Sequence, residues 1–113
     1  MHNRRRDPRI RLELPVQIWG VDAKGARYSQ AATAGDISFG GALISGIQLE
    51  LRPGDLIGIQ HGNKRARYRV VWARDSGGAG KNQAAVQRLD DSECPWRDIL
   101  ERLALAAAAG EMP

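Results

Sequence analysis

Hydrophobic and polar residues alternate along much of the chain with a period of two. Between residues 12 and 19 every second position is apolar, and between 64 and 72 apolar positions alternate with arginines. This alternation predicts strands that bury one face. Turn signals separate the apolar stretches, namely "DAKG" at 22–25, "RPGD" at 52–55 and "GN" at 62–63. We therefore predict six short strands, at residues 12–19, 26–34, 42–51, 56–61, 64–72 and 82–89.

Individual residues within these strands refine the pattern. Pro15 has no amide donor, so we expect it at an edge or a bulge of the first strand. Trp72 continues the apolar side of the fifth strand after Val70, so the alternation favours a place in the core. The charged positions of this segment are expected to form a solvated face, at Arg65, Arg67, Arg69 and Arg74.

The pattern becomes helical near the C-terminus. From Pro95 onward, apolar residues at spacings of three and four share one helical face, at Trp96, Ile99, Leu100 and Leu103. Ser92 or Asp91 is expected to cap the helix, Gly110 to end it, and Asp98 to pair with Arg102. The strands and this helix together predict a mainly β fold, a small six-stranded antiparallel barrel with one C-terminal α-helix.

Charge divides the chain into a flexible basic arm (1–11), the barrel (12–91) and the C-terminal helix (92–110). The arm holds five arginines against Asp7 and so carries a charge of +4, equal to the net charge of the whole chain: Arg4, Arg5, Arg6, Arg9 and Arg11. Positive charge concentrated in one arm predicts contact with an anion, most often a phosphate. The alternative is a solvated basic tail.

Length and composition limit the class of protein further. A chain of 113 residues is one domain by length. No apolar run approaches the roughly 20 residues that span a bilayer, so we expect no membrane insertion. The N-terminus lacks the apolar run of a secretory signal, and a single cysteine, Cys94, suits a reducing compartment. We therefore expect a cytoplasmic protein.

Two short motifs carry candidate binding chemistry. "DISFGG" at 36–41 has an Asp-x-Ser-x-x-Gly spacing formed by Asp36, Ser38 and Gly41, and "RRRDPR" at 4–9 has an Arg-x-x-x-Arg spacing formed by Arg5 and Arg9. Each motif alone occurs often by chance, and the first is also consistent with an ordinary turn. Their joint occurrence, with a strand between them, favours one shared ligand site.

In this order, and in a small β chain, the two motifs resemble the PilZ domain family. "PVQIW", "GGALI", "RPGD" and "YRVVWAR" extend the resemblance over about residues 4–89. The resemblance implies a stand-alone PilZ-type barrel that binds cyclic di-guanylate (c-di-GMP), with ligand-binding residues Arg4, Arg5, Arg6, Arg9, Asp36, Ser38, Gly40 and Gly41. An arginine at position 4 implies a stacked, intercalated ligand dimer. Trp72 is a further candidate, because an aromatic residue stacks on a guanine in some PilZ proteins.

The chemistry of this ligand is consistent with the residues that the motifs supply. Cyclic di-GMP carries two phosphodiesters and two guanines, whose edges offer acceptors (O6, N7) and donors (N1–H, N2–H₂). Arg5 and Arg9 suit the acceptors and phosphates, and the Asp36 carboxylate suits the donors; the Ser38 hydroxyl suits either. Both glycines of the motif are expected to permit positive φ and close approach. We expect the arm to become ordered when ligand binds, so that an effector protein recognises the liganded surface.

The sequence offers no arrangement typical of catalysis or metal binding. It contains no nucleophile–base pair and no Walker-type loop, and His2 and His61 lack metal-ligand spacing. We expect a receptor with no catalytic residue, metal or cofactor. One alternative is a nucleic-acid-binding barrel that uses the arm and residues 65–69, which an aromatic content of 5% disfavours. Another is a PilZ-like adaptor that binds no ligand, which the intact motifs disfavour.

Overall fold

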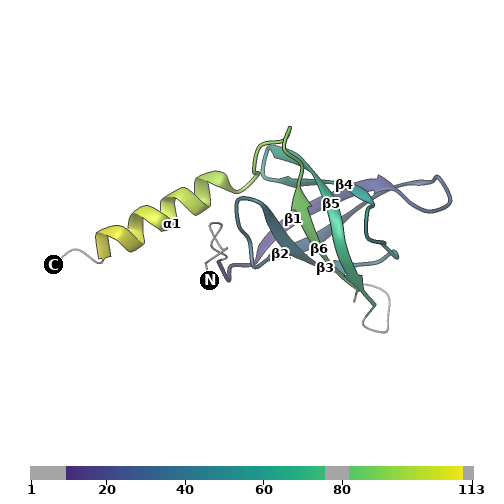
Figure 1. The fold of residues 1–113 in the computed structure, drawn as a ribbon, viewed down its shortest axis with the longest axis horizontal. Helices are drawn as coiled ribbons and strands as arrows, with labels where there is room; N and C mark the ends of the chain where they lie inside the picture. Colours follow the sequence, from purple (N-terminus) through teal and green to yellow (C-terminus); the bar gives the residue numbers. More distant parts are fainter. Residues whose placement is uncertain (1–9, 76–81, 111–113) are drawn as a thin grey trace, which may run out of the picture.

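The structure, a computed structural model, describes residues 10–75 and 82–110. Within these residues, six antiparallel strands close into a barrel in the order β1-β2-β3-β6-β5-β4, and one helix, α1, follows them (Figure 1). The elements are β1 (Leu14–Val21), β2 (Arg27–Gly35), β3 (Gly41–Ile47), β4 (Leu56–His61), β5 (Lys64–Arg74), β6 (Asn82–Arg88) and α1 (Arg97–Gly110). The predicted mainly β barrel with a C-terminal helix is confirmed.

The alternating apolar positions fill the barrel interior, as their period predicted. In β1, Leu14, Val16 and Ile18 are buried while the residues between them are exposed. The core continues through β4 and β5, where Ile59 and Tyr68 are also fully buried. Each large apolar side chain removed from water in this way contributes about 1.5–3 kcal/mol. The barrel is therefore held together mainly by its inward-facing aliphatic residues.

Two strands differ in detail from the pattern in the sequence. Pro15 pairs with β2 at Thr33, whereas the ladder between β1 and β4 covers only 17–19, so Pro15 has a strand neighbour on one side alone. The third strand ends at Ile47 and not near residue 51. Gly46 has a φ of 79° there, and the register with β6 shifts between Ile44 and Ile47. This left-handed backbone accompanies an irregularity near the end of β3, after which, among the described residues, only Ile47 pairs with β6.

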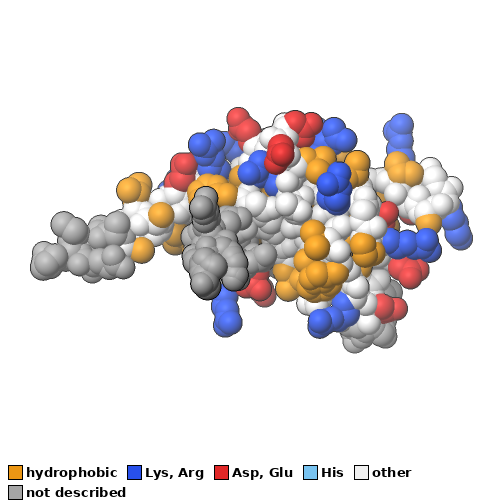
Figure 2. All heavy atoms as spheres, in the orientation of Figure 1, with side chains coloured by type: hydrophobic (Ala, Val, Ile, Leu, Met, Phe, Trp, Pro, Cys, Tyr) orange, Lys and Arg blue, Asp and Glu red, His pale blue; other side chains and the backbone are white. Residues whose placement is uncertain are grey.

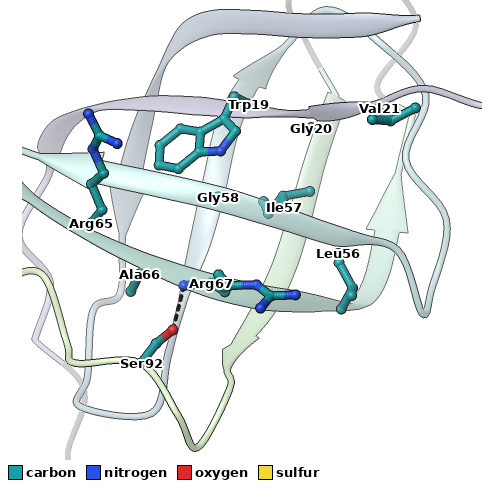
Figure 3. A pocket seen from close by; sticks show the side chains of 10 residues that line it. All are labelled: Trp19, Gly20, Val21, Leu56, Ile57, Gly58, Arg65, Ala66, Arg67 and Ser92. Carbon is teal, nitrogen blue, oxygen red and sulfur yellow. Dashed lines mark hydrogen bonds between the residues drawn. The ribbon is translucent and has the colours of Figure 1, made fainter. Parts of the chain in front are cut away.

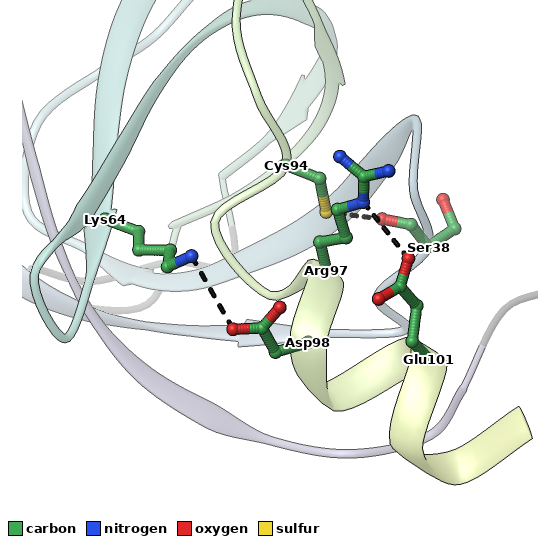
Figure 4. A network of polar contacts seen from close by, with 6 residues as sticks. All are labelled: Ser38, Lys64, Cys94, Arg97, Asp98 and Glu101. Atoms are coloured by element: carbon green, nitrogen blue, oxygen red, sulfur yellow. Dashed lines mark hydrogen bonds and ion pairs between the residues drawn. The ribbon is translucent and has the colours of Figure 1, made fainter. Parts of the chain in front are cut away.

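Among the side chains described for the helix α1 and the residue before it, the buried ones lie at its N-terminal end. Trp96, just before α1, and Leu100 are buried, whereas the side chains of residues 101–107 are exposed, and Figure 1 shows α1 extending away from the barrel. The predicted Asp98–Arg102 pair is replaced by other contacts (Figure 4): Asp98 lies 3.5 Å from the amine of Lys64, and Arg97 bonds Glu101 at 3.1 Å. Both ion pairs are exposed and stabilise α1 little.

Tyr28 on β2 is packed against β1 at Gly20. A Cβ atom at Gly20 would lie 2.7 Å from the Tyr28 hydroxyl, so glycine is needed there to make room for the phenol ring. Burial, together with smaller effects of the negative charges of Asp55 and Asp22, raises the pKa of Tyr28 to about 12. The neutral phenol is therefore the form that the folded state favours.

Candidate functional site

The Asp-x-Ser-x-x-Gly motif forms the loop between β2 and β3, and Ile10, near the end of the basic arm, lies beside it. Ile10 pairs with Ile37 in an isolated antiparallel bridge: the Ile10 amide donates to the Ile37 carbonyl at 2.8 Å, and the Ile37 amide donates to the Ile10 carbonyl at 3.0 Å. Ile37 is fully buried, so it anchors the loop in the core. The bridge holds the chain that leaves the arginine motif against the residue between Asp36 and Ser38.

Asp36 directly follows β2 and has an unusual backbone conformation. Its φ is 43°, in the left-handed region that aspartate tolerates better than most residues other than glycine. Asp36 is half-buried and lines a depression of about 430 Å³ together with Arg11 and outward-facing residues of β2, β3 and β6. The depression therefore has one guanidinium, that of Arg11, and two carboxylates, those of Asp36 and Glu13, on its wall.

The Ser38 side chain is buried and forms hydrogen bonds within the loop. It is 1% exposed; its hydroxyl accepts from the Gly41 amide at 3.0 Å and lies 3.3 Å from the Gly41 carbonyl, to which it donates. The backbone repeats this closure, because the Ser38 amide donates to the Gly41 carbonyl at 2.9 Å. These contacts are those of a serine-stabilised turn, which was the alternative interpretation of this residue.

The two glycines serve a purpose other than positive φ. In this loop the left-handed φ occurs at Asp36, and neither Gly40 nor Gly41 has one, so the expectation of positive φ was wrong. Gly41 is required by close packing instead: a Cβ atom there would lie 2.5 Å from the backbone oxygen of Val86 on β6. The carbonyl of Gly40 accepts from the Arg88 amide at 2.7 Å. Gly41 thus allows β3 to approach β6 closely where the loop ends.

Trp72 lies on the outer surface of the barrel, so the placement in the core favoured by the alternation was wrong. The register between β5 and β6 shifts between Val70, which pairs with Val86, and Trp72, which pairs with Ala85. This bulge inserts one residue and reverses the side to which the following residues point. Trp72 is consequently 39% exposed and lines a depression of about 350 Å³ that includes Ser38, Gly40 and Gly41.

The depressions at Asp36 and Trp72 adjoin each other across one sheet surface. Leu43 on β3 lines the first, Ala85 on β6 lines the second, and the two residues are direct cross-strand partners. Ala85 is also the partner of Trp72, so a row of apolar side chains crosses three strands. Figure 2 shows hydrophobic side chains gathered over the region of β3, β5 and β6. Arg74 lies over the Trp72 ring, with its Cζ atom 5.5 Å from the ring centroid.

The site therefore combines residues that were predicted with residues that were not. Arg4, Arg5, Arg6 and Arg9 lie outside the described residues. Arg11 was counted in the charge of the arm but was not chosen as a site residue, although it faces the same depression as Asp36. Arg88 was also missed; its guanidinium donates to the carbonyls of Phe39 at 2.7 Å and of Ser92 at 2.5 Å. Its place at the end of a strand gave no signal of this role.

Cys94 and Trp96, in the C-terminal segment, contact the loop at Ser38. The indole Nε1 of Trp96 donates to the Ser38 carbonyl at 2.7 Å. Figure 4 shows the Cys94 thiol beside the same oxygen, at 3.8 Å. The Trp96 ring is fully buried and packs 5.8 Å from the Tyr68 ring, centroid to centroid. The conformation of the loop is thus fixed by residues more than fifty positions further along the chain.

Comparisons with known proteins identify the family to which this arrangement belongs. Comparison with curated proteins found no match. In the described part of the chain, no helix is long and apolar enough to cross a membrane, and no group of three His, Cys, Asp or Glu side chains is placed to hold a metal ion. A family model described as the PilZ domain matches residues 3–106. PilZ domains are generally c-di-GMP-binding receptor or adaptor modules and not enzymes. With a match that covers nearly its whole length, this chain belongs to the PilZ domain family.

Proposed function

We propose that this protein is a receptor for c-di-GMP that binds its ligand on the outer surface of β3, β5 and β6, beside the loop 36–41. The Ile10–Ile37 bridge is the observation that carries the proposal. Arg9 is bonded to Ile10, and consecutive Cα atoms are about 3.8 Å apart, so the arginine motif enters beside Asp36. The proposal thus assigns a guanidinium-rich segment and a carboxylate to one surface, from positions far apart in the sequence.

Each part of this surface has a role that follows from the chemistry of the ligand. Arg4, Arg5, Arg6 and Arg9 bind phosphates and the O6/N7 edge of guanine, to which a guanidinium fork is matched. Asp36 accepts from the N1–H and N2–H₂ donors of guanine. The exposed ring of Trp72 and the apolar row beside it support a base by stacking, which is worth about 1–3 kcal/mol per base. Ser38 and Gly41 act by shaping the loop.

Ligand binding orders the arginine arm over this surface, and so changes both the shape and the charge of the surface. The entropy lost by the arm lowers the net affinity but makes the ordered surface dependent on the ligand. A partner protein that recognises the liganded surface then receives the signal. The chain acts as a cytoplasmic receptor, without catalysis and without a bound cofactor. Arg4 favours two intercalated ligand molecules per chain.

Isothermal titration calorimetry with c-di-GMP tests the proposal. We expect binding by the intact chain, with two ligand molecules per chain, and a loss of roughly tenfold or more in affinity for Arg5→Ala and for Arg9→Ala. Arg27→Ala removes an equal charge from an exposed position on β2 and should bind as the unmodified chain does. Circular dichroism should show the same folded spectrum for all four proteins.

The contrary results are distinct. Unchanged affinity in both Arg5→Ala and Arg9→Ala would remove the arm from the site. Heat on titration with a single-stranded oligonucleotide at physiological salt, with none for c-di-GMP, would favour the nucleic-acid-binding alternative. Binding of neither compound by the folded chain would favour an adaptor that has no ligand.

A further inference from the structure

A second concave surface lies on the barrel away from the β2–β3 loop. It is a groove of about 640 Å³ over the outer faces of β1, β4 and β5, and Figure 3 shows the side chains that line it. Its principal residues are Trp19, Val21, Leu56, Gly58, Arg65 and Arg67. None of these residues lines the depressions at Asp36 and Trp72. The groove therefore shares no lining residue with the depressions of the proposed c-di-GMP site.

The groove forms where the ladder between β1 and β4 opens. The last paired residues are Trp19 and Gly58, although β1 runs on to Val21 and β4 starts at Leu56. The next two positions on each strand are paired only with their other neighbours, β2 and β5, among the described residues. Two short strand edges consequently face each other across the groove, and such edges are open to pairing with another chain.

Apolar side chains line this opening to an extent that is unusual for solvent-exposed positions. Val21 is 60% exposed and Leu56 is 46% exposed. The Trp19 ring lies directly over Gly58, at a position where a Cβ atom of residue 58 would overlap the ring. Gly58 therefore lets the indole lie flat on the sheet and form one wall. Exposed apolar side chains gathered in a concave surface indicate a binding site more often than scattered ones do.

The charged residues of the groove are all positive. Arg65 and Arg67 project from β5, and the Arg65 guanidinium lies 5.9 Å from the centroid of the Trp19 ring. No acidic residue lines the groove, and within the described residues neither guanidinium forms an ion pair. An acidic group entering the groove would thus meet two arginines that have no competing carboxylate partner.

We propose that this groove binds an extended, acidic segment of a partner protein, which adds a short strand at the open β1–β4 seam. Its backbone pairs with an exposed strand edge, an apolar side chain lies between Trp19 and Leu56, and carboxylates lie against Arg65 and Arg67. The strand edges favour a peptide over a nucleotide, because only a polypeptide backbone supplies matching amide donors and acceptors. A symmetric dimer through the groove is disfavoured, because it would bring Arg65 and Arg67 toward their own copies.

The test uses the whole chain, immobilised, and a phage-displayed library of short random peptides. We expect the selected sequences to carry acidic residues around one aliphatic or aromatic residue. Amide chemical shifts should then change at 19–21, 56–58 and 65–67 when a selected peptide is added, with or without c-di-GMP present. Methylating alternate peptide amides should abolish binding, because it removes the donors that a strand needs.

Charge reversal supplies the matched controls. Arg65→Glu combined with Arg67→Glu should weaken peptide binding by roughly tenfold or more, whereas Arg102→Glu on the exposed part of α1 should leave it unchanged. Val21→Asp, at a position 60% exposed, provides a second variant should the double variant fold poorly. The proposal is overturned if the library shows no enrichment or no acidic bias, or if the amide shifts change elsewhere on the barrel. It is also overturned if Val21→Asp binds the peptide as well as the unmodified chain does, or if the chain forms a dimer that closes the groove. Because the groove and the loop share no residue, loss of peptide binding with c-di-GMP binding intact bears on this proposal alone.

Discussion

The hydrogen bond between Trp96 and the Ser38 carbonyl gives the sharpest stability prediction for this fold. Trp96→Phe keeps an aromatic ring but removes the indole N–H, which donates to that carbonyl at 2.7 Å. The only other contact described at this oxygen is the Cys94 thiol at 3.8 Å, which is a weak donor. The substitution therefore leaves a buried carbonyl poorly satisfied and reduces the volume of a side chain that is fully buried.

The size of the effect follows from these two losses. Leaving a buried acceptor without its donor costs about 1–3 kcal/mol, and the partial cavity left by the smaller ring adds about 1 kcal/mol. We expect the free energy of unfolding to fall by about 2–4 kcal/mol, from a total that is typically about 5–15 kcal/mol for a small domain. With a urea dependence of about 2 kcal/mol per molar, the middle of the usual range, the unfolding midpoint should fall by roughly 1–2 M.

Urea unfolding followed by far-ultraviolet circular dichroism measures this shift. Trp72→Phe is the matched control, because it makes the same substitution at a position 39% exposed and should change the free energy of unfolding by less than about 0.5 kcal/mol. In calorimetry, Trp96→Phe should also weaken c-di-GMP binding, since the loop 36–41 loses its support. A midpoint for Trp96→Phe equal to that of the control would refute the idea that the C-terminal segment holds the loop.

Three further predictions follow from the same geometry. Gly41→Ala should destabilise the fold by about 1–3 kcal/mol in urea unfolding, because the added Cβ meets the backbone of β6, whereas Gly35→Ala, whose Cβ would lie 4.0 Å from its nearest neighbour, should be nearly neutral. Trp72→Ala should lower c-di-GMP affinity by roughly tenfold in calorimetry, with little change in stability; unchanged affinity would exclude stacking. The raised pKa of Tyr28, about 12, means that its contribution to stability is complete below about pH 10 and is lost as the pH rises through about 12. Unfolding free energies measured across that interval should fall less steeply in Tyr28→Phe.

The contacts of the β2–β3 loop connect it both to the segment before α1 and to the groove. Arg88 bonds the loop at the Phe39 carbonyl and bonds Ser92 just ahead of α1, while Trp96 bonds the loop at Ser38. The Ser92 hydroxyl in turn accepts from the Arg67 amide at the border of the groove. A movement of the loop would therefore change hydrogen bonds both in the segment before α1 and beside the groove.

Some residues of the site could be predicted from the sequence, and others could not. The spacing of Asp36, Ser38 and Gly41, together with the Arg-x-x-x-Arg spacing before the first strand, was sufficient to recognise the resemblance to the family. It did not reveal that the Ser38 hydroxyl is buried in a turn, or that Gly41 is needed because β6 lies so close. Arg88 carried no local signal at all, since its partners are carbonyls brought to it by the closing of the barrel.

The sequence by itself determined the class of fold, because the period of two depends only on which side chains avoid water along each strand. It also determined the motif, because the order of residue types is a property of the chain. Only the tertiary structure decided where those strands deviate and what their surfaces meet. The bulge that turns Trp72 outward and the early end of the β1–β4 ladder both depend on the register between strands distant in the sequence. Register is set by the packing of the whole barrel, and a local pattern cannot contain it.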